Sequence, residues 1–371
     1  MGLTFEIQDR IEPLLSEWEH LAQQTKAAPF LWPGWVSAWW GAFGKGQLQI
    51  FTVYENGHLT GVLPLHRQRR TLSSTTNAHT PQFGFLADSE VARKQLSNAL
   101  FSRKARRIDL CYLSPTDASV SLTRAAADAA SYRALAQSMQ APPYLTIDGD
   151  WNAYETGLRG QFRRDLHRRR RRLENEGRVT LEVSDGKERL NELLDEGFLV
   201  EELAWKGAQG SSINSSPATR RFYTEVAHWA AGRGWLRLAF LRLDGRALAF
   251  DYCLEYNKIH YMMKTGYDPV YARFSPGRIL RYLMLARAFS EGLATYDLGG
   301  MPEAWKLEWT DTCQERLFLH MFPPTPLGGL DRAAFVFHRS ALEGAKRFVR
   351  SPVVGERGRT ILKRIYARLN Q

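Results

Sequence analysis

The order of helix-like and strand-like segments in the second half of the chain constrains the fold more than any single motif. One strand-like run leads into two amphipathic helical patterns, and three strand-like runs joined by turn signals follow them. A helical pattern and two more strand-like runs complete the half. In chain order these segments are residues 179–183, 187–207, 219–234, 236–245, 246–257, 258–268, 278–292, 294–300 and 314–322. This order predicts an α/β (α+β) fold with a mixed central sheet flanked by helices.

The first half carries a looser version of the same order. Two helical patterns, at 11–24 and 35–43, precede a pair of strand-like runs. Asn56-Gly57 between these runs predicts a β-hairpin with a type I′ turn, because both residues tolerate a positive φ. Pro142-Pro143 is expected to mark the end of this half. A chain of 371 residues exceeds one typical core. We therefore predict three parts: residues 1–145, residues 146–325 and a basic helical extension at 326–371.

Charge is unevenly distributed along the chain. Residues 1–150 carry 14 Lys+Arg and 13 Asp+Glu, a net charge of +1, whereas residues 151–371 carry 36 and 26, a net charge of +10. An anionic partner is therefore expected to meet the second half. The chain has no HExxH sequence, no Cys/His ligand cluster, no Walker loop and no dinucleotide fingerprint. We accordingly expect no metal ion.

The run RRDLHRRRRRLENEG, at 163–177, is the densest basic segment. Phe162, Leu166 and Leu173 have the spacing of one apolar helix stripe, and the arginines cover the rest of the circumference. Five consecutive arginines therefore cannot all face one groove. We interpret the run as a domain-connecting helix with a solvated, partly structural role. Contact with the phosphates of a nucleotide-linked donor or of a membrane, or with tRNA, remains an alternative.

Several features bear on localisation. The first residues include acids and lack the apolar core of a signal peptide, and no apolar run reaches the roughly 20 residues of a membrane span. Cys111, Cys253 and Cys313 form no CxxC pair, which fits reduced thiols in the cytosol. We expect a cytoplasmic protein. The sequence RTILKRIYARL, at 359–369, predicts either contact with the anionic inner face of a membrane or packing onto the second domain.

Short motifs in the second half resemble those of a known family. They are PPYLTIDGDW at 142–151, WKG at 205–207, KTGYDPVYARFSPGRIL at 264–280 and YDLGGMPEAWKLEWT at 296–310. These stretches resemble bacterial acyltransferases of the CelD/BcsL, or BioF-like acetyltransferase, type. That family is a branch of the GNAT superfamily related to Fem-type aminoacyl transferases. The resemblance covers residues 140–322 closely and 1–139 loosely, and it implies tandem GNAT-like domains, the first of them degenerate.

The resemblance implies a donor site and a reaction centre. A helix start favours anions through its free amides and its dipole, so RFSPGRIL would hold the diphosphate of an acyl-CoA co-substrate. The residues implied there are Tyr267, Arg273, Phe274, Ser275, Pro276, Gly277 and Arg278. Lys306 would stabilise a developing oxyanion, or it covers an amphipathic face. Asp297 would accept a proton, or it caps the following glycine turn. Lys264 would line the thioester site, or it is an ordinary edge-strand lysine.

The resemblance also implies an acceptor site near the second long helix. Trp205, Lys206 and Ser211 occupy the corresponding place. The Trp205 ring would stack on a sugar or an acyl chain, although core packing is the commoner role of a tryptophan. Glu201 and Glu202, on the same helix, are expected to face solvent.

Three functions fit these residues. The favoured one is an acyl-CoA-dependent GNAT-family acyltransferase, acetyl being the simplest group, that acts on an amine or hydroxyl of a sugar, polysaccharide precursor, lipid or amino acid. One alternative is a Fem-like transferase that uses charged tRNA. The other is a catalytically silent GNAT-fold scaffold in a polysaccharide-synthesis complex. Nucleic acid is expected as a partner only under the tRNA alternative.

Overall fold

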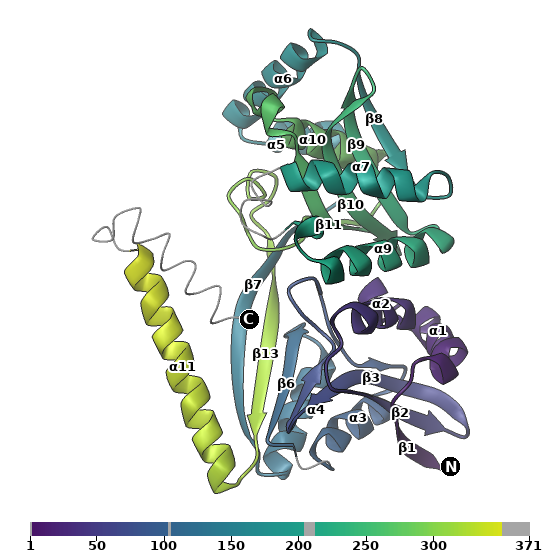
Figure 1. Cartoon of the computed structure of the whole chain (residues 1–371), viewed down its shortest axis with the longest axis vertical. Helices are drawn as coiled ribbons and strands as arrows, with labels where there is room; N and C mark the ends of the chain where they lie inside the picture. The colour runs from purple at the N-terminus through teal and green to yellow at the C-terminus, as the bar shows by residue number, and fades with distance from the viewer. Residues whose placement is uncertain (1, 103–104, 204–211, 351–371) are drawn as a thin grey trace.

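The computed structural model describes residues 2–102, 105–203 and 212–350, and in this part of the chain thirteen strands form one sheet (Figure 1). The strands are β1 (Leu3–Gln8), β2 (Gln47–Glu55), β3 (His58–Gln68), β4 (Thr71–Ser74), β5 (Leu86–Ala87), β6 (Arg107–Leu113), β7 (Arg133–Thr146), β8 (Val179–Ser184), β9 (Leu236–Leu243), β10 (Arg246–Tyr256), β11 (Ile259–Tyr267), β12 (Thr295–Asp297) and β13 (Cys313–Phe322).

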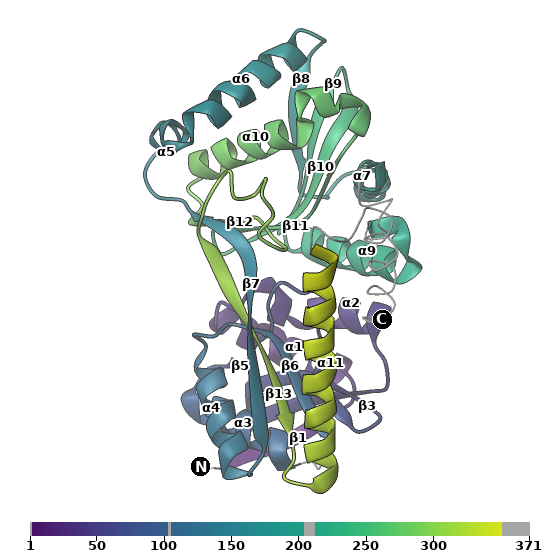
Figure 2. The same cartoon turned by 90° about the vertical axis from the view of Figure 1, so that its left-hand side faces the viewer.

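Helices cover the faces of this sheet. In the first half they are α1 (Leu15–Gln24), α2 (Pro33–Phe43), α3 (Glu90–Ser102) and α4 (Ala118–Ala129). In the second half they are α5 (Trp151–Gly157), α6 (Gly160–Glu174), α7 (Leu190–Leu203), α9 (Pro217–Gly232), the 3₁₀ helix η4 (Pro269–Phe274), α10 (Pro276–Ser290) and α11 (Pro326–Arg350). Figure 2 shows α6 and α10 on one face of the upper part of the sheet, and α7 and α9 on the other.

The strand order repeats on either side of a central pair. The order is β1-β2-β3-β4-β6-β13-β7-β12-β11-β10-β9-β8, and β5 pairs with β3. In each half three antiparallel pairings lead to one parallel pairing, β4 with β6 and β11 with β12. The long strands β7 and β13 are exchanged, because β13 pairs with β6 of the first half and β7 pairs with β12 of the second. They run antiparallel to each other from one half to the other (Figures 1 and 2).

The structure bears on two local predictions, the hairpin at Asn56-Gly57 and the end of the first half at Pro142-Pro143. The hairpin is confirmed, since Asn56 and Gly57 have φ values of 52° and 82° between β2 and β3. The prolines Pro142 and Pro143 do not interrupt the secondary structure, because β7 continues through both to Thr146, and their role as the end of the first half stays a prediction. The prolines lie where β7 passes from pairing with β13, at Pro143, to pairing with β12, at Tyr144. A residue without an amide hydrogen is tolerated at such a change of partner.

The two halves share a hydrophobic core. One cluster of buried side chains joins residues of α1, α2, β2 and β3 to residues of α7, α9, β9 and β10. Aromatic rings form the contact, with Trp35 meeting Phe222 at 5.1 Å and Phe30 meeting Tyr261 at 5.1 Å between centroids. Because each half buries apolar surface against the other, they stabilise one another. The predicted boundary at residue 145 stays a prediction.

Helix α11 lies against the exchanged strand pair and exposes much of its surface. Asp331 forms an ion pair with Arg106, and the Phe335 ring packs 4.4 Å from the His320 ring. Leu330 and Phe337 of the same helix are 65% and 76% exposed. Among the described helices, none is both long and apolar enough to cross a bilayer. The basic run at 359–369 lies outside the described residues.

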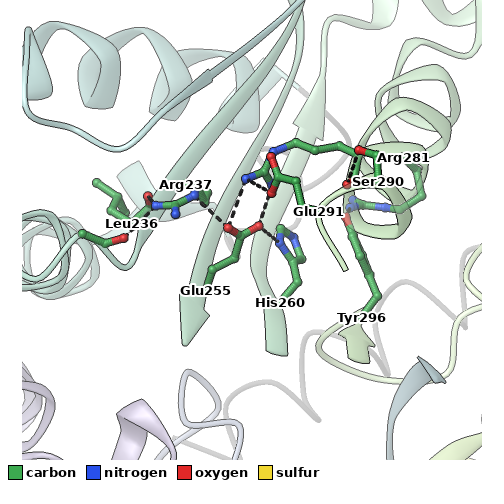
Figure 3. Close-up of polar contacts among 10 residues, drawn as sticks. Leu236, Arg237, Glu255, His260, Arg281, Ser290, Glu291 and Tyr296 are labelled. Atoms are coloured by element: carbon green, nitrogen blue, oxygen red, sulfur yellow. Dashed lines mark hydrogen bonds and ion pairs between the residues drawn. The ribbon is translucent and has the colours of Figure 1, made fainter. Parts of the chain in front are cut away.

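A buried ionic network joins β9, β10, β11 and α10 (Figure 3). Glu255 lies 2.7 Å from Arg237, 2.6 Å from Arg287 and 2.8 Å from Nδ1 of His260. Burial alone raises the pKa of Glu255, but hydrogen bonds from His260 and Arg287 outweigh burial and hold this pKa well below its usual range. Burial lowers the pKa of His260.

We expect acid to destabilise the protein through this network. A lowered carboxyl pKa gives stability that is present above the ordinary value of 4.5 and is lost as the pH falls below it. The lowered pKa of His260 acts in the same direction below its ordinary value of 6.5. The free energy of unfolding, measured with urea, should therefore decrease from pH 7 to pH 4. The decrease below pH 5 should be shallower in Glu255→Gln, and an unchanged slope would contradict this assignment.

Candidate active site

A wedge opens where β11 and β12 separate. The two strands pair in parallel from Ile259↔Thr295 to Tyr261↔Asp297, where β12 ends while β11 continues to Tyr267. A cavity of about 1110 Å³ lies in this opening. Its walls come from the residues that follow the last paired residue of β11 and of β12, and from the starts of α10 and α9. A loop of the first half completes the walls. The wall residues used below are His79, Pro81, Ser212, Tyr223, Lys264, Tyr267, Ser275, Gly277, Arg278, Gly299, Met301, Glu303, Lys306 and Arg316.

The start of α10 forms one side of the cavity. Ser275 precedes the helix in a left-handed conformation, with φ of 55° and ψ of 57°, and Pro276 occupies the first turn. Pro276 suits that position because it has no amide hydrogen to leave unpaired and its φ is already helical. Gly277 leaves room beside the cavity, since an added Cβ would meet only the Tyr267 ring, at 3.6 Å. The sequence here therefore folds into a helix start that faces open space.

The seven residues implied for the donor site separate into two groups. Tyr267, Ser275, Gly277 and Arg278 line the cavity. The Arg278 guanidinium also lies 2.7 Å from a Glu308 oxygen. The other three point elsewhere: Phe274 and Pro276 are buried in the core, and Arg273 reaches out to Glu176 at 3.4 Å.

Asp297 lies at the apex of the wedge, behind the cavity wall. Its side chain is buried, with Oδ1 accepting the Gly299 amide at 2.8 Å and Oδ2 accepting Nε2 of Gln314 at 3.3 Å. The turn cap considered from the sequence is therefore present. Burial raises the pKa of Asp297 to about 6, against the lowering effects of the Gly299 amide and of the charges on Arg316 and Lys306. A carboxyl with this pKa exchanges protons near neutral pH.

Lys306 holds the glycine turn that follows β12. Its ammonium donates to the carbonyls of Gly299 at 2.6 Å and Met301 at 3.1 Å, and lies 3.1 Å from a Glu303 oxygen. Gly299 is required there, because φ is 62° and a Cβ would sit 1.9 Å from the Met262 carbonyl oxygen. The turn thus packs directly on β11, with the lysine charge buried beneath the cavity. This arrangement gives Lys306 a structural role whether or not it also acts on an oxyanion.

We expect Lys306→Met to destabilise the protein. The substitution removes the ammonium from two carbonyls and a carboxylate, at a cost of about 3 kcal/mol in the free energy of unfolding. Urea unfolding measures this change, with the exposed Lys258→Met as a control that should leave the value unchanged. An unaltered stability together with a lowered reaction rate would contradict the structural role.

Lys264 and Glu201 meet on the opposite side of the cavity. The Lys264 ammonium lies 3.9 Å from Oε1 of Glu201 and 5.4 Å from the centroid of the Tyr223 ring. The expectation that Glu201 faces solvent is wrong, because this side chain is fully buried and Oε2 accepts the Ile213 amide at 2.8 Å. The reason lies in Gly266, where a Cβ would come within 2.4 Å of the Glu201 Cα. Because glycine has no Cβ at this position, α7 packs directly on β11.

The corresponding wedge of the first half is filled by the chain itself. There β4 pairs in parallel with β6 as far as Ser73↔Asp109. Phe83 then occupies the opening: it is 3% exposed, its amide donates to the Tyr112 carbonyl at 2.9 Å, and it bridges to Leu113. The first half therefore has no equivalent cavity at its own wedge among the described residues.

The segment that fills the first wedge contributes to the cavity of the second half. His79 Nδ1 lies 3.3 Å from the Tyr223 hydroxyl, and its ring stacks on Phe43 at 5.4 Å. Burial, assisted by the charge of Lys264, lowers the pKa of His79 to about 4, so its imidazole is neutral at pH 7. Arg316 of β13 is 5% exposed and donates to the Pro81 carbonyl at 2.9 Å.

Sequence reasoning missed His79 and Arg316. No motif surrounds His79, and its place in the cavity depends on the packing of the two halves. Arg316 carried one weak signal, a charged residue directly before the apolar part of a strand-like run. Trp205, Lys206 and Ser211, implied for the acceptor, lie outside the described residues, although Ser212 next to them lines the cavity. Within the described ranges, no group of three His, Cys, Asp or Glu side chains is placed to hold a metal ion.

Comparison with known proteins agrees with this architecture. Residues 160–307 match the acetyltransferase (GNAT) domain family. This segment is a GNAT-fold domain. The matched segment begins at α6 and ends just after Lys306. The start of α10, Asp297 and Lys306 all lie within it, whereas β13 and the first half lie outside. The repeated strand order gives the whole chain two tandem GNAT-like units.

Solved structures extend the likeness in fold to most of the chain. The C-terminal domain of a candidate lysylphosphatidylglycerol synthetase from Agrobacterium fabrum is 15% identical, with a TM-score of 0.53 over 90% of this chain and 97% of that one. FemX is 13% identical, with a TM-score of 0.58 over 85% of this chain and 97% of that one. A protein of unknown function from Bacteroides thetaiotaomicron is 12% identical, with a TM-score of 0.50. No curated protein matches the chain in sequence.

Proposed function

We propose that the protein is an acyltransferase that moves an acyl group from acyl-CoA to an amine or hydroxyl. The observation that carries the proposal is the wedge between β11 and β12, with the start of α10 at its side and a carboxyl of raised pKa at its apex. A cavity of about 1110 Å³ has room for the extended arm of a donor and for an acceptor together.

The residues at the start of α10 fit a donor diphosphate. A helix start presents amide hydrogens and a positive dipole end to an anion. Gly277 and Ser275 border the cavity, and the space that a Cβ would take at Gly277 is open apart from Tyr267. Arg278 adds a guanidinium at the same place. Acyl-CoA would supply the activated thioester, and these residues would bind and orient it.

Asp297 is the group best suited to accept the proton of the acceptor. Its pKa of about 6 leaves it mainly ionised at pH 7 and still basic enough to take a proton. The adjacent Gly299 and the nearby Arg316 line the cavity, so a small rearrangement or one water molecule would connect the carboxylate to a bound acceptor. Attack of the amine or hydroxyl on the thioester carbonyl would then release the CoA thiol.

The acceptor enters from the side where the first half meets α9. His79 of the first half lines the cavity there together with Ser212 and Tyr223 of the second half. A sugar, a polysaccharide precursor, a lipid headgroup or an amino acid presents the polar groups that such a wall binds. We place the protein with the CelD/BcsL-type, BioF-like branch of GNAT enzymes on the motifs quoted above, with acetyl as the simplest transferred group.

A thiol-release assay tests this function. Acetyl-CoA and longer acyl-CoAs would be paired with amine and hydroxyl acceptors, and free thiol measured over time. Gly277→Val serves as the matched variant, because its side chain would project into the donor space without a backbone clash. We expect release with the wild-type protein and little with Gly277→Val. No release with any pair, together with no CoA binding by calorimetry, would overturn the proposal.

A tRNA-dependent transfer is the second candidate, and the arginines of α6 favour it. Arg164, Arg168, Arg170 and Arg171 surround a hollow of about 570 Å³ on the outer face of this helix. Such a surface suits a nucleic acid backbone, whose binding weakens steeply with salt. Charged tRNA that shifts the protein at 50 mM salt but not at 300 mM would support this candidate, and no shift at either salt would exclude it.

A further inference from the structure

The turn at residues 273–277, called the donor turn below, holds Ser275 in an unfavourable backbone conformation. Ser275 has φ of 55° and ψ of 57°, in the left-handed region that is unfavourable for a residue with a Cβ. The conformation is what turns the chain from η4 into α10: the Ser275 amide donates to the Ala272 carbonyl at 3.0 Å, and the Ser275 carbonyl accepts the Arg278 amide at 3.0 Å. Such a conformation persists only where surrounding groups hold it.

An arginine of α6 supplies contacts that hold the turn. Nη1 of Arg169 donates to the Arg273 carbonyl at 2.9 Å and to the Ser275 hydroxyl at 3.1 Å. Nε of the same guanidinium donates to Asp165 at 2.6 Å, one helical turn earlier. The planar guanidinium therefore reaches from α6 to the strained residue and to the carbonyl two residues before it, and Asp165 fixes its orientation.

The other α6 arginines with hydrogen bonds among the described residues bind within or next to that helix. Arg163 donates to the Thr156 carbonyl, Arg170 to Glu174, and Arg171 to the His167 carbonyl. Arg168 binds Asp165. Helix α6 packs against η4 with Leu166 and Leu173 buried, and Arg169 lies on that side. The arginine run thus contains one residue whose bonds reach the donor turn.

We propose that Arg169 is a positioning residue for the donor site: it holds Ser275 in the left-handed conformation that aims the start of α10, with the Gly277 amide, at a diphosphate. The proposal rests on the proposed function for its ligand. The proposal gives one arginine of the run a role of its own. This role differs from the chemistry of acyl transfer and from the arginine surface on the outer face of α6.

Calorimetry with three probes tests the role in binding. The probes are CoA, adenosine 3′,5′-diphosphate and pantetheine. The 5′-phosphate of the nucleotide corresponds to part of the diphosphate of CoA, whereas pantetheine has no phosphate. Loss of one charge-assisted contact should weaken CoA binding about tenfold in Arg169→Ala. The nucleotide should weaken similarly and pantetheine should not change. Arg171→Ala, on the outer side of α6, is the matched control and should bind all three as the wild type does.

A rescue variant separates positioning from direct phosphate contact. Glycine adopts the left-handed region without a steric penalty, so Ser275→Gly in the Arg169→Ala background should restore most of the CoA affinity. No rescue, with both proteins folded, would overturn the positioning role and leave direct phosphate binding.

Hydrogen exchange measured without any ligand separates the role of Arg169 in holding the turn from the proposal that the protein binds CoA. The amides of Ser275, Gly277, Arg278 and Ile279 should exchange faster in Arg169→Ala than in the wild type or in Arg171→Ala. Unchanged exchange would overturn the inference even if CoA binds. A different pair of results would overturn the CoA proposal: the wild type binds no CoA, and the amides of the turn exchange faster in Arg169→Ala than in the wild type. The role of Arg169 in holding the turn would then stand.

Discussion

Asp297→Asn is expected to lower kcat/KM for acyl transfer about 100- to 10,000-fold, the range for loss of a positioned general base. Asparagine keeps the side-chain oxygen that accepts the Gly299 amide, so the turn cap survives while the proton acceptor is lost. In the wild type the rate should fall as the pH falls through about 6, because protonation at the raised pKa removes the base. Thiol release measured from pH 5 to pH 8 gives both results.

Stability separates this loss from misfolding. A raised carboxyl pKa means that ionisation opposes folding as the pH rises from the ordinary value of 3.8 through about 6. Asp297→Asn should therefore be at least as stable as the wild type at pH 8. Asp117→Asn, which also keeps a cap but lies at the start of α4, is the matched control and should retain full activity. Full activity of Asp297→Asn would remove the carboxylate from the chemistry.

Arg281→Met is expected to lower the free energy of unfolding by about 3–5 kcal/mol, because it leaves a buried charge without its partner. Arg281 of α10 and Asp251 of β10 are 1% and 0% exposed and lie 2.9 Å apart. Arg281 also donates to the Tyr296 hydroxyl, as Figure 3 shows. Urea unfolding at pH 7 measures the loss.

A double variant shows whether the unpaired charge is the cause. Arg281→Met with Asp251→Leu replaces both charges by apolar side chains, and it should recover most of the lost stability. The exposed pair Arg221 and Glu225 provides the control, since Arg221→Met should change stability by less than about 1 kcal/mol. A double variant as unstable as Arg281→Met would contradict the explanation.

The secondary structure of the second half follows from its sequence because each element carries a local signal. The spacing of Leu166 and Leu173 predicts the buried stripe of α6, and both residues are buried in the structure. Pro276 at the start of α10 and Asn56-Gly57 in the first hairpin are equally local, since each residue type suits the φ it must adopt.

The exchange of β7 and β13 could not be predicted in this way. The run of β13 was recognisable as a strand, whereas most of β7, from Arg133 to Pro143, was not predicted. The partners of both strands lie more than a hundred residues away, so no local pattern specifies them. The same limit applies to the candidate site. Ser275, Gly277 and Arg278 are contiguous in sequence, and their motif predicted a site where they do line the cavity, whereas His79 and Arg316 reach the cavity only through contacts between the halves.

Burial was the other quantity that the sequence left open. Glu201 sits in a helix with several exposed acids, and only the close approach of α7 to Gly266 makes it a buried partner for Lys264. Lys306 was identified from its motif, but the carbonyls that it holds belong to a turn whose geometry depends on Gly299 packing against β11.

A crystal structure of the protein grown with CoA tests the central claim most directly. We expect the diphosphate within hydrogen-bonding distance of the amides that begin α10, beside Ser275 and Gly277, with the pantetheine arm between β11 and the end of β12. Density for CoA elsewhere on the molecule, or a wedge that stays empty at saturating CoA, would contradict the assignment of this opening as the donor site.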